Sequence, residues 1–173
     1  MARGGDTPAD GVRGELAVIF VTVGSNPTFR FDRLIDAVAQ LDAQDLVVQY
    51  GPASPPRGGG VAEAHQWLTF DQVLDYMGAA DTVISHAGTG TIMCAANMGH
   101  VPVVVPRLKS LGETVDDHQV ALATVFEQTG QVAVAWDVTS LPERVAQTSK
   151  RGVAAKSGDG ALQSAVRLAL RDL

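Results

Sequence analysis

The chain has 173 residues and a mass of 18.1 kDa, enough for one domain with a buried core. Its composition, with 46% hydrophobic and 18% charged residues, excludes a chain that is disordered throughout. The net charge of −6 argues against nucleic-acid binding, and the one cysteine, Cys94, excludes an internal disulfide and a multi-cysteine metal site.

Residues 1–14 are mostly small and charged around one proline, which predicts a disordered tail and offers no apolar run for a signal peptide. No stretch of the sequence approaches the 18 consecutive apolar residues of a membrane span. Together with the single cysteine, this predicts a cytoplasmic protein that does not itself span a membrane.

Short apolar runs, several of them rich in β-branched residues, predict buried strands. The predicted strands are 16–23, 45–50, 66–70, 82–85, 101–106 and 131–136. Apolar residues at helical spacing and cap residues predict the helices between them. These lie around 31–38, from Asp71, after Thr91, at 116–130 with Gly130 as the C-terminal cap, and from a Thr139 or Ser140 cap. The Pro- and Gly-rich residues 52–60 predict an exposed loop.

Strands that alternate with helices at this spacing indicate parallel βαβ units. We therefore predict that residues 15–149 form a single Rossmann-like α/β domain. Its parallel sheet should have about six strands, with helices on both faces. Residues 150–173 are predicted to be a linker followed by an amphipathic C-terminal helix.

An open parallel sheet binds its ligands at the carboxyl ends of its strands, and three strand ends here are specialised. The first is Gly24-Ser25-Asn26. The second, HAGTGT at 86–91, has glycines that let backbone amides approach a ligand, and its two threonines add hydroxyls where the next helix begins. This chemistry suits a phosphate or diphosphate, although a glycine turn needed only for tight packing explains the same residues.

The third strand end carries Arg107, whose charge suits a phosphate, and the polar run Asp117, His118 and Gln119. This run begins a helix and offers donors and acceptors for sugar hydroxyls. Acidic residues also stabilise a helix N-terminus without any ligand, and we favour that role for Asp116. The four histidines are too widely spaced to predict a metal site, and Cys94 is predicted to be a packed core thiol.

Four segments of the chain, at 21–38, 80–92, 99–107 and 112–123, resemble the C-terminal, donor-binding domain of family 28 glycosyltransferases. The order HAGTGT, PVVVPR, GE, DDHQ is more specific than any one motif. The resemblance covers about residues 16–148 and is closest to small stand-alone members. These are the soluble subunit of the eukaryotic two-subunit UDP-N-acetylglucosamine transferase acting on dolichol-linked sugar, and bacterial exopolysaccharide and capsule subunits.

The resemblance implies half of a GT-B architecture that binds a UDP-sugar as substrate and needs neither a metal ion nor another cofactor. It assigns the UDP diphosphate to Gly24, Ser25, Asn26, His86, Gly88, Thr89, Gly90, Thr91 and Arg107. It assigns the donor sugar to Glu113, Asp117, His118 and Gln119, and the uracil to backbone groups around 67–70. His86 is the candidate for a direct catalytic role, as a donor to the leaving phosphate. The alternative is that His86 only caps its strand end, and no catalytic base is assigned.

One residue departs from the family pattern. Many relatives have a glutamate on the helix after the glycine turn, where it binds the ribose hydroxyls, and Cys94 occupies that position here. A thiol cannot replace a bidentate carboxylate. Ribose recognition must then come from other residues, or the affinity is weaker.

The resemblance covers only a donor half, which implies that the acceptor site lies on a separate, membrane-anchored chain. That partner would recruit this one to the inner face of the membrane. The predicted function is the donor-binding subunit of a heterodimeric hexosyltransferase that uses a UDP-sugar and a lipid-linked or polysaccharide acceptor, inactive without its partner. The alternative is a non-catalytic enhancer subunit with the same fold. A nucleotide-sugar epimerase is a weaker third possibility, because those enzymes need two domains in one chain.

Overall fold

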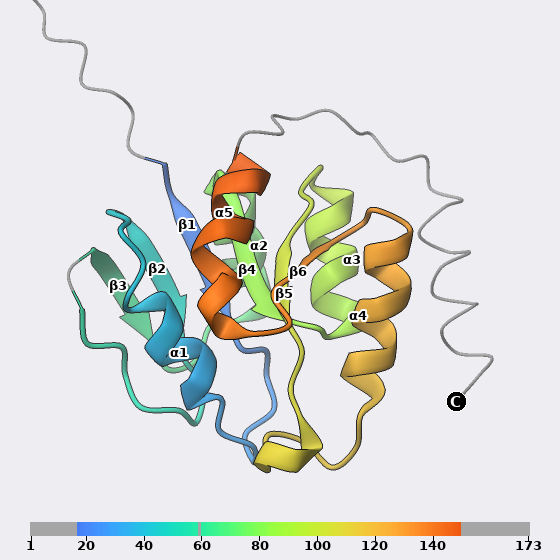
Figure 1. Cartoon of the computed structure of the whole chain (residues 1–173). Coiled ribbons are helices and arrows are strands. Elements are labelled where there is room, and N and C mark those ends of the chain that lie inside the picture. The colour runs from blue at the N-terminus through green and yellow to red at the C-terminus, as the bar shows by residue number, and fades with distance from the viewer. Residues whose placement is uncertain (1–16, 59, 150–173) are drawn as a thin grey trace, which may run out of the picture.

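The computed structural model describes residues 17–58 and 60–149, so the predicted tail and the C-terminal linker and helix lie outside the described residues. The described part is a six-stranded parallel sheet with helices on both faces (Figure 1). The predicted α/β, Rossmann-like fold class is therefore confirmed. Within this part of the chain, no helix has the length and apolar character to cross a membrane.

The sheet has the strand order β3-β2-β1-β4-β5-β6, and every pair of neighbours is parallel. Its strands are β1 (Ile19–Thr22), β2 (Leu46–Gln49), β3 (Val61–His65), β4 (Thr82–His86), β5 (Val103–Val105) and β6 (Ala133–Val134). The chain runs outward from β1 to β3, then returns to pair β4 with the other side of β1. The direction of winding therefore reverses between β1 and β4, and ligands of such sheets bind at the carboxyl ends beside this switch point.

Within the described residues, five α-helices cover the sheet: α1 (Asp32–Val38), α2 (Phe70–Ala79), α3 (Thr89–Asn97), α4 (His118–Gln128) and α5 (Leu141–Ser149). Helices α1 and α5 lie in front of the sheet in Figure 1 and pack on the side chains that β1, β2 and β4 direct toward this face. The other three pack on the opposite face. Two 3₁₀ turns, η1 (Lys109–Leu111) and η2 (Val138–Ser140), precede α4 and α5. Both faces bury mainly aliphatic side chains.

The predicted strand at 66–70 is wrong, because the third strand is Val61–His65. This edge strand is mostly exposed and so lacks the apolar run that marks a buried strand. Residues 66–69 lead instead into α2, where Thr69 accepts a hydrogen bond from the Gln72 amide and the Gln72 side chain accepts one from the Thr69 amide. This reciprocal cap starts the helix at Phe70.

The last described helix, α5, begins at Leu141, directly after the predicted cap residues Thr139 and Ser140. These two residues lie in η2, whose N-cap is Asp137, which accepts a hydrogen bond from the Thr139 amide at 2.8 Å. Gly130 follows α4 with a φ of +70°, and its role as a C-terminal cap is confirmed.

Helix α3 is less buried than its apolar sequence predicts, since only Ile92 and Ala95 of its residues are fully buried. Cys94 is partly buried and packs with Leu68 and Val73 against the core residues around Met77. The predicted packing role of this thiol agrees with these contacts.

Candidate functional site

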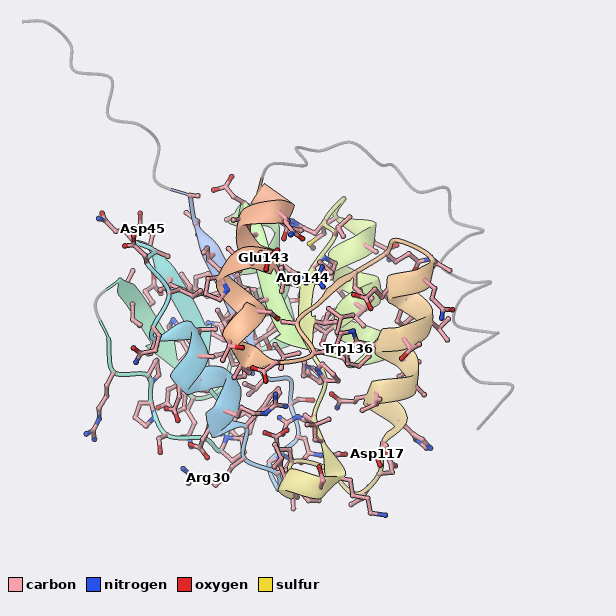
Figure 2. All side chains as sticks on the ribbon, in the orientation of Figure 1. Arg30, Asp45, Asp117, Trp136, Glu143 and Arg144 are labelled. Atoms are coloured by element: carbon pink, nitrogen blue, oxygen red, sulfur yellow. The ribbon has the colours of Figure 1, made fainter. Side chains whose placement is uncertain are left out.

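The carboxyl ends of the strands gather most of the polar residues singled out by the sequence. This edge is the lower one in Figures 1 and 2, where Arg30 and Asp117 lie, whereas Asp45 marks the opposite edge. The turn after β1 (residues 24–26) and the turn after β4 (residues 87–88) adjoin there, because β1 and β4 are neighbours in the sheet. The two glycine turns predicted to bind one ligand are therefore brought together.

His86 fills the space between these two turns. A Cβ atom built on Gly24 would lie 2.5 Å from His86 Cε1, and one built on Gly88 would lie 2.2 Å from His86 Nε2. Both distances are far below van der Waals contact, so the imidazole needs glycine on each side. Gly24 also has a φ of +80°, a conformation that other residues rarely adopt.

The imidazole of His86 is neutral at physiological pH. Burial lowers the pKa of His86 to about 4, and the positive charge of Arg107 adds to this shift. Nδ1 is buried and makes no hydrogen bond of ordinary geometry within residues 17–58 and 60–149. A backbone group of Thr22 acts on the imidazole in the opposite sense and raises its pKa in part.

This pKa predicts a pH-dependent loss of stability. An unfolded histidine takes up its proton near pH 6.5, whereas His86 in the folded protein does so only near pH 4. As the pH falls through this interval, the free energy of unfolding should fall by about 3 kcal/mol relative to a His86→Asn variant. Urea unfolding of both proteins at pH 7.5 and pH 4.5 measures the difference. A constant difference across this range would contradict the neutral imidazole with its buried Nδ1.

The N-terminus of α3 is open to a ligand. Gly88 is its N-cap, no side chain caps its free amides, and its first turn has no acidic residue. Thr89 and Thr91 are partly buried and Gly90 is exposed. Free amides and the helix dipole together favour an anion at this position.

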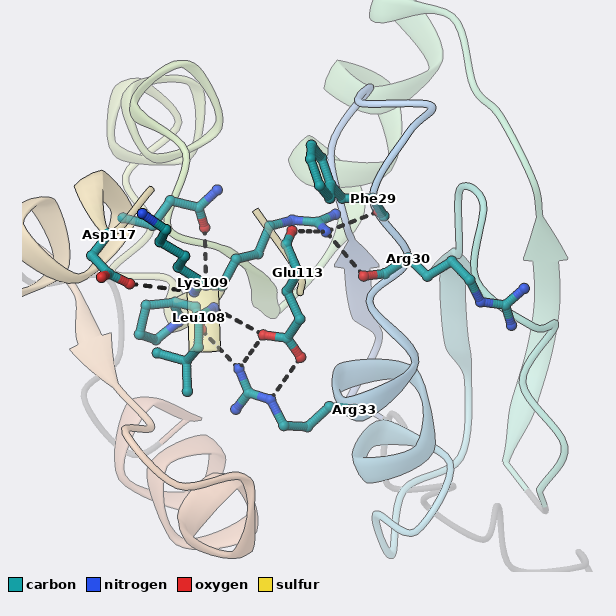
Figure 3. Close-up of polar contacts among 10 residues, drawn as sticks. Phe29, Arg30, Arg33, Leu108, Lys109, Glu113 and Asp117 are labelled. Atoms are coloured by element: carbon teal, nitrogen blue, oxygen red, sulfur yellow. Dashed lines mark hydrogen bonds and ion pairs between the residues drawn. The ribbon is translucent and has the colours of Figure 1, made fainter. Parts of the chain in front are cut away.

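Arg107 lies at the carboxyl edge, as predicted, but its guanidinium binds backbone carbonyls. It is only 3% exposed and donates hydrogen bonds to the carbonyl oxygens of Phe29, Arg30 and Glu113 at 3.0–3.3 Å (Figure 3). It donates another to the Val23 carbonyl oxygen at 3.0 Å. It also lies 4.6 Å from the centre of the buried Phe31 ring. The structure thus assigns Arg107 to holding the loops around the site together rather than to the diphosphate.

Glu113 differs from its prediction in the same way. Its carboxylate accepts two hydrogen bonds from Arg33, at 2.9 and 2.8 Å, and one from the Leu108 amide at 2.9 Å. The side chain is buried, so these partners occupy the oxygens that were assigned to the donor sugar. Its partner Arg33 lies on α1, 80 residues away, and sequence spacing gives no sign of it.

The predicted sugar-binding run lies at the start of α4 beside Arg107. Asp117 accepts a hydrogen bond from the Lys109 amide at 3.3 Å, and His118 pairs with Asp116 at 3.4 Å. Gln119 accepts one from the Arg107 amide through Oε1 at 3.2 Å, while its Nε2 has no partner among the described residues. Of the three, Gln119 therefore has a free donor in a fixed position.

The sequence did not single out three buried polar residues at this edge: Thr22, Gln49 and Ser85, which end or nearly end β1, β2 and β4. A polar residue closing an apolar strand was the available signal. Between residues 17 and 149, apart from residue 59, no three His, Cys, Asp or Glu side chains gather as a metal ion would require.

Two hollows of about 580 and 530 Å³ lie at the opposite edge of the sheet and share residues 41–44. Asp42 lines both hollows and Asp45 lines one of them. Carboxylates repel a diphosphate, so these hollows do not compete with the carboxyl edge as an anion site.

Comparison with known proteins decides between the possible meanings of this arrangement. Residues 18–166 match the glycosyltransferase family 28 C-terminal domain. The chain belongs to this family. It is also 30% identical, over 138 residues, to the UDP-N-acetylglucosamine transferase subunit ALG13 of Yarrowia lipolytica, an alignment that covers 72% of this chain and 67% of that protein.

Solved glycosyltransferases share the fold of this family 28 domain. CalG4, the calicheamicin glycosyltransferase, superposes with a TM-score of 0.52 at 21% identity, and the glycotransferase of kitacinnamycin with 0.53 at 22%. The superpositions cover 93% and 90% of this chain. They cover only 40% and 39% of those proteins, so the chain spans about two fifths of their length.

Proposed function

We propose that this family 28 domain is the donor-binding part of a glycosyltransferase that uses a UDP-sugar. The observation that carries the proposal is the junction of two glycine turns around His86, beside the uncapped N-terminus of α3. An uncapped helix start offers amide donors to a diphosphate without requiring a metal ion.

In this proposal the diphosphate lies against residues 88–91, beside Nε2 of His86. A neutral imidazole with a pKa of about 4 cannot deliver a proton as a strong acid at pH 7. It can donate a hydrogen bond to the phosphate oxygen on which negative charge develops. His86 therefore acts as a fixed donor to the leaving group.

The reaction is a displacement at the anomeric carbon of the donor sugar. The acceptor hydroxyl forms the new bond to this carbon, and the bond from the carbon to the diphosphate oxygen breaks. UDP leaves with the electron pair, and its charge is stabilised by the α3 amides and His86. The proton of the acceptor hydroxyl passes to a base that we place on a second chain.

Exposed apolar residues around the proposed site support such a second chain. Trp67 precedes α2 and Phe70 is its first residue, while Leu111 and Val115 lie between β5 and α4. These four residues have exposures of 43–66%. We propose that an acceptor-binding subunit, anchored in the membrane, covers this edge and brings the chain to the cytoplasmic face. The relative in Yarrowia lipolytica is itself named as a subunit.

The purified chain alone is then expected to transfer no sugar. The physical reason is that an acceptor hydroxyl in water is not held against the anomeric carbon. Incubation with radiolabelled UDP-N-acetylglucosamine and a membrane extract of lipid acceptors, with and without a co-expressed partner, measures this. Rapid transfer by the chain in the absence of any other polypeptide would contradict the divided site.

A pair of substitutions distinguishes binding of the diphosphate from binding of the donor sugar. Thr91→Val removes a hydroxyl beside the α3 amides and should weaken UDP and UDP-N-acetylglucosamine alike, by about tenfold to a hundredfold, since bonds to charged groups are the stronger ones. Gln119→Ala removes the free Nε2 donor without adding a charge, together with the oxygen that accepts from the Arg107 amide. It should weaken only the UDP-sugar, by about two- to tenfold.

Calorimetry of both variants with both ligands, in EDTA, measures these four affinities. If Gln119→Ala weakens UDP as much as Thr91→Val does, Gln119 does not serve the sugar. The alternative function, a non-catalytic enhancer subunit, rests on Cys94 at the position of the ribose-binding glutamate. Absence of UDP binding at millimolar concentration would favour it.

A further inference from the structure

Buried polar side chains are concentrated under the first glycine turn of the site. Among the described residues seven polar side chains are buried, and Thr22, Gln49, Ser85, Arg107 and Glu113 of these lie at the carboxyl edge. The register of the sheet pairs Thr22 with Gln49 on one side and with Ser85 on the other. Three adjacent strands thus end in a polar row, although their preceding residues are almost all aliphatic or aromatic.

Thr22, Gln49 and Gly24 form a closed ring of three hydrogen bonds. The Thr22 hydroxyl donates to Gln49 Oε1 at 2.5 Å, and the Gly24 amide donates to Thr22 Oγ1 at 3.1 Å. Gln49 Nε2 donates to the Gly24 carbonyl oxygen at 3.5 Å, the longest of the three. Both peptide groups of Gly24 are therefore held by side chains that are only 2–3% exposed.

A small displacement of this ring of hydrogen bonds would move the Gly24 turn and with it the proposed diphosphate site. Gly24 has a φ of +80° and packs against the His86 imidazole, and its turn continues into Ser25 and Asn26. Asn26 Oδ1 accepts from the Thr28 amide at 2.8 Å and so fixes the far end of the same turn. From the other side, Arg107 holds the Val23 carbonyl oxygen at 3.0 Å.

A purely structural role explains the ring poorly. Replacing two buried hydrogen-bonded groups by apolar ones of the same shape is close to neutral for stability. Aliphatic residues at positions 22 and 49 would continue the pattern of their strands. What they could not do is hold the two peptide groups of a left-handed glycine.

We infer that Thr22 and Gln49 are positioning residues, which hold the Gly24 turn and the His86 ring in the geometry that receives the donor diphosphate. The inference rests on the proposed function and adds two residues that act through Gly24 and not by touching the ligand. Their effect should appear in UDP affinity and in the order of the turn more than in stability.

Three variants test it. Thr22→Val keeps the shape and breaks the ring, Thr22→Ser keeps the hydroxyl, and Gln131→Leu is a control. Gln131 is a buried glutamine before β6, at the far edge of the sheet, with no partner for its side-chain amide among the described residues. We expect Thr22→Val to lower UDP affinity about tenfold, with Thr22→Ser and Gln131→Leu within twofold of the unchanged protein.

Amide hydrogen exchange gives the second readout, without ligand. The Gly24 amide should exchange about tenfold faster in Thr22→Val, while the Val21 amide inside β1 keeps its rate. If the unchanged protein binds no UDP, the proposed function fails and this inference fails with it. If the unchanged protein binds UDP and Thr22→Val binds it equally well, only this inference is overturned.

Discussion

Replacing Arg107 by methionine is expected to lower the free energy of unfolding by roughly 3–5 kcal/mol. The guanidinium joins four carbonyl oxygens from three segments: the end of β1, the loop before α1 and the residue Glu113. Methionine fills much of the same volume and donates no hydrogen bond. It would leave those carbonyls without their donor in a site that is 3% exposed, and would lose the contact with the Phe31 ring.

Arg30→Met is the matched control for this substitution. Arg30 lies in the loop before α1, and its guanidinium pairs with Asp32 at 2.7 Å in an exposed position. We expect little change in stability there, because solvent screens such pairs. Urea unfolding midpoints at pH 7.5 measure both variants. An Arg107→Met midpoint equal to that of Arg30→Met would refute the structural role of Arg107.

Replacing Gly24 by alanine should have the second-largest effect, on the order of 3 kcal/mol, through two separate causes. The first is the φ of +80°, which disfavours any side chain by about 1–2 kcal/mol. The second is the collision of the new methyl group with the His86 ring at 2.5 Å. Either the imidazole or the turn must move, so UDP affinity should fall as well.

Two other glycines separate these causes. Gly130 has a φ of +70° and open space around its Cα, so Gly130→Ala measures the backbone strain alone. Gly88 has an ordinary φ of −87°, and a Cβ atom placed on it would lie 2.2 Å from His86 Nε2. Gly88→Ala therefore measures the collision with the ring alone. The loss for Gly24→Ala should approach the sum of the two. A loss no larger than that of Gly130→Ala would mean that the His86 ring does not pack there.

The fold was predictable wherever burial on both faces of the sheet leaves a continuous run of apolar residues. The apolar runs at 16–23, 45–50 and 82–85 predicted three inner strands, because strands buried on both faces must be apolar throughout. The structure has these strands at Ile19–Thr22, Leu46–Gln49 and Thr82–His86. The edge strand β3 has no such constraint, since most of its side chains face solvent. Its position was therefore misjudged by five residues.

The candidate site was predictable in its backbone and not in its side-chain partners. Glycine at positions 24 and 88 indicates turns whose geometry tolerates no side chain, and the structure brings both turns to His86. Arg107 was assigned to the ligand because a positive charge after a strand suits that role, and Glu113 because the family resemblance implies it. Their partners, Val23 and Arg33, lie 84 and 80 residues away in the sequence, and only the folded chain brings them together.

The most direct test of the account is the place where UDP binds. In ¹⁵N-labelled protein with EDTA present, titration with UDP should shift the amide resonances of residues 24–26 and 86–91 most strongly. The amides of residues 41–45, at the opposite edge, should stay unchanged. The absence of shifts at millimolar UDP, or shifts centred on residues 41–45, would contradict the claim that this chain holds a nucleotide-sugar at the carboxyl ends of β1 and β4.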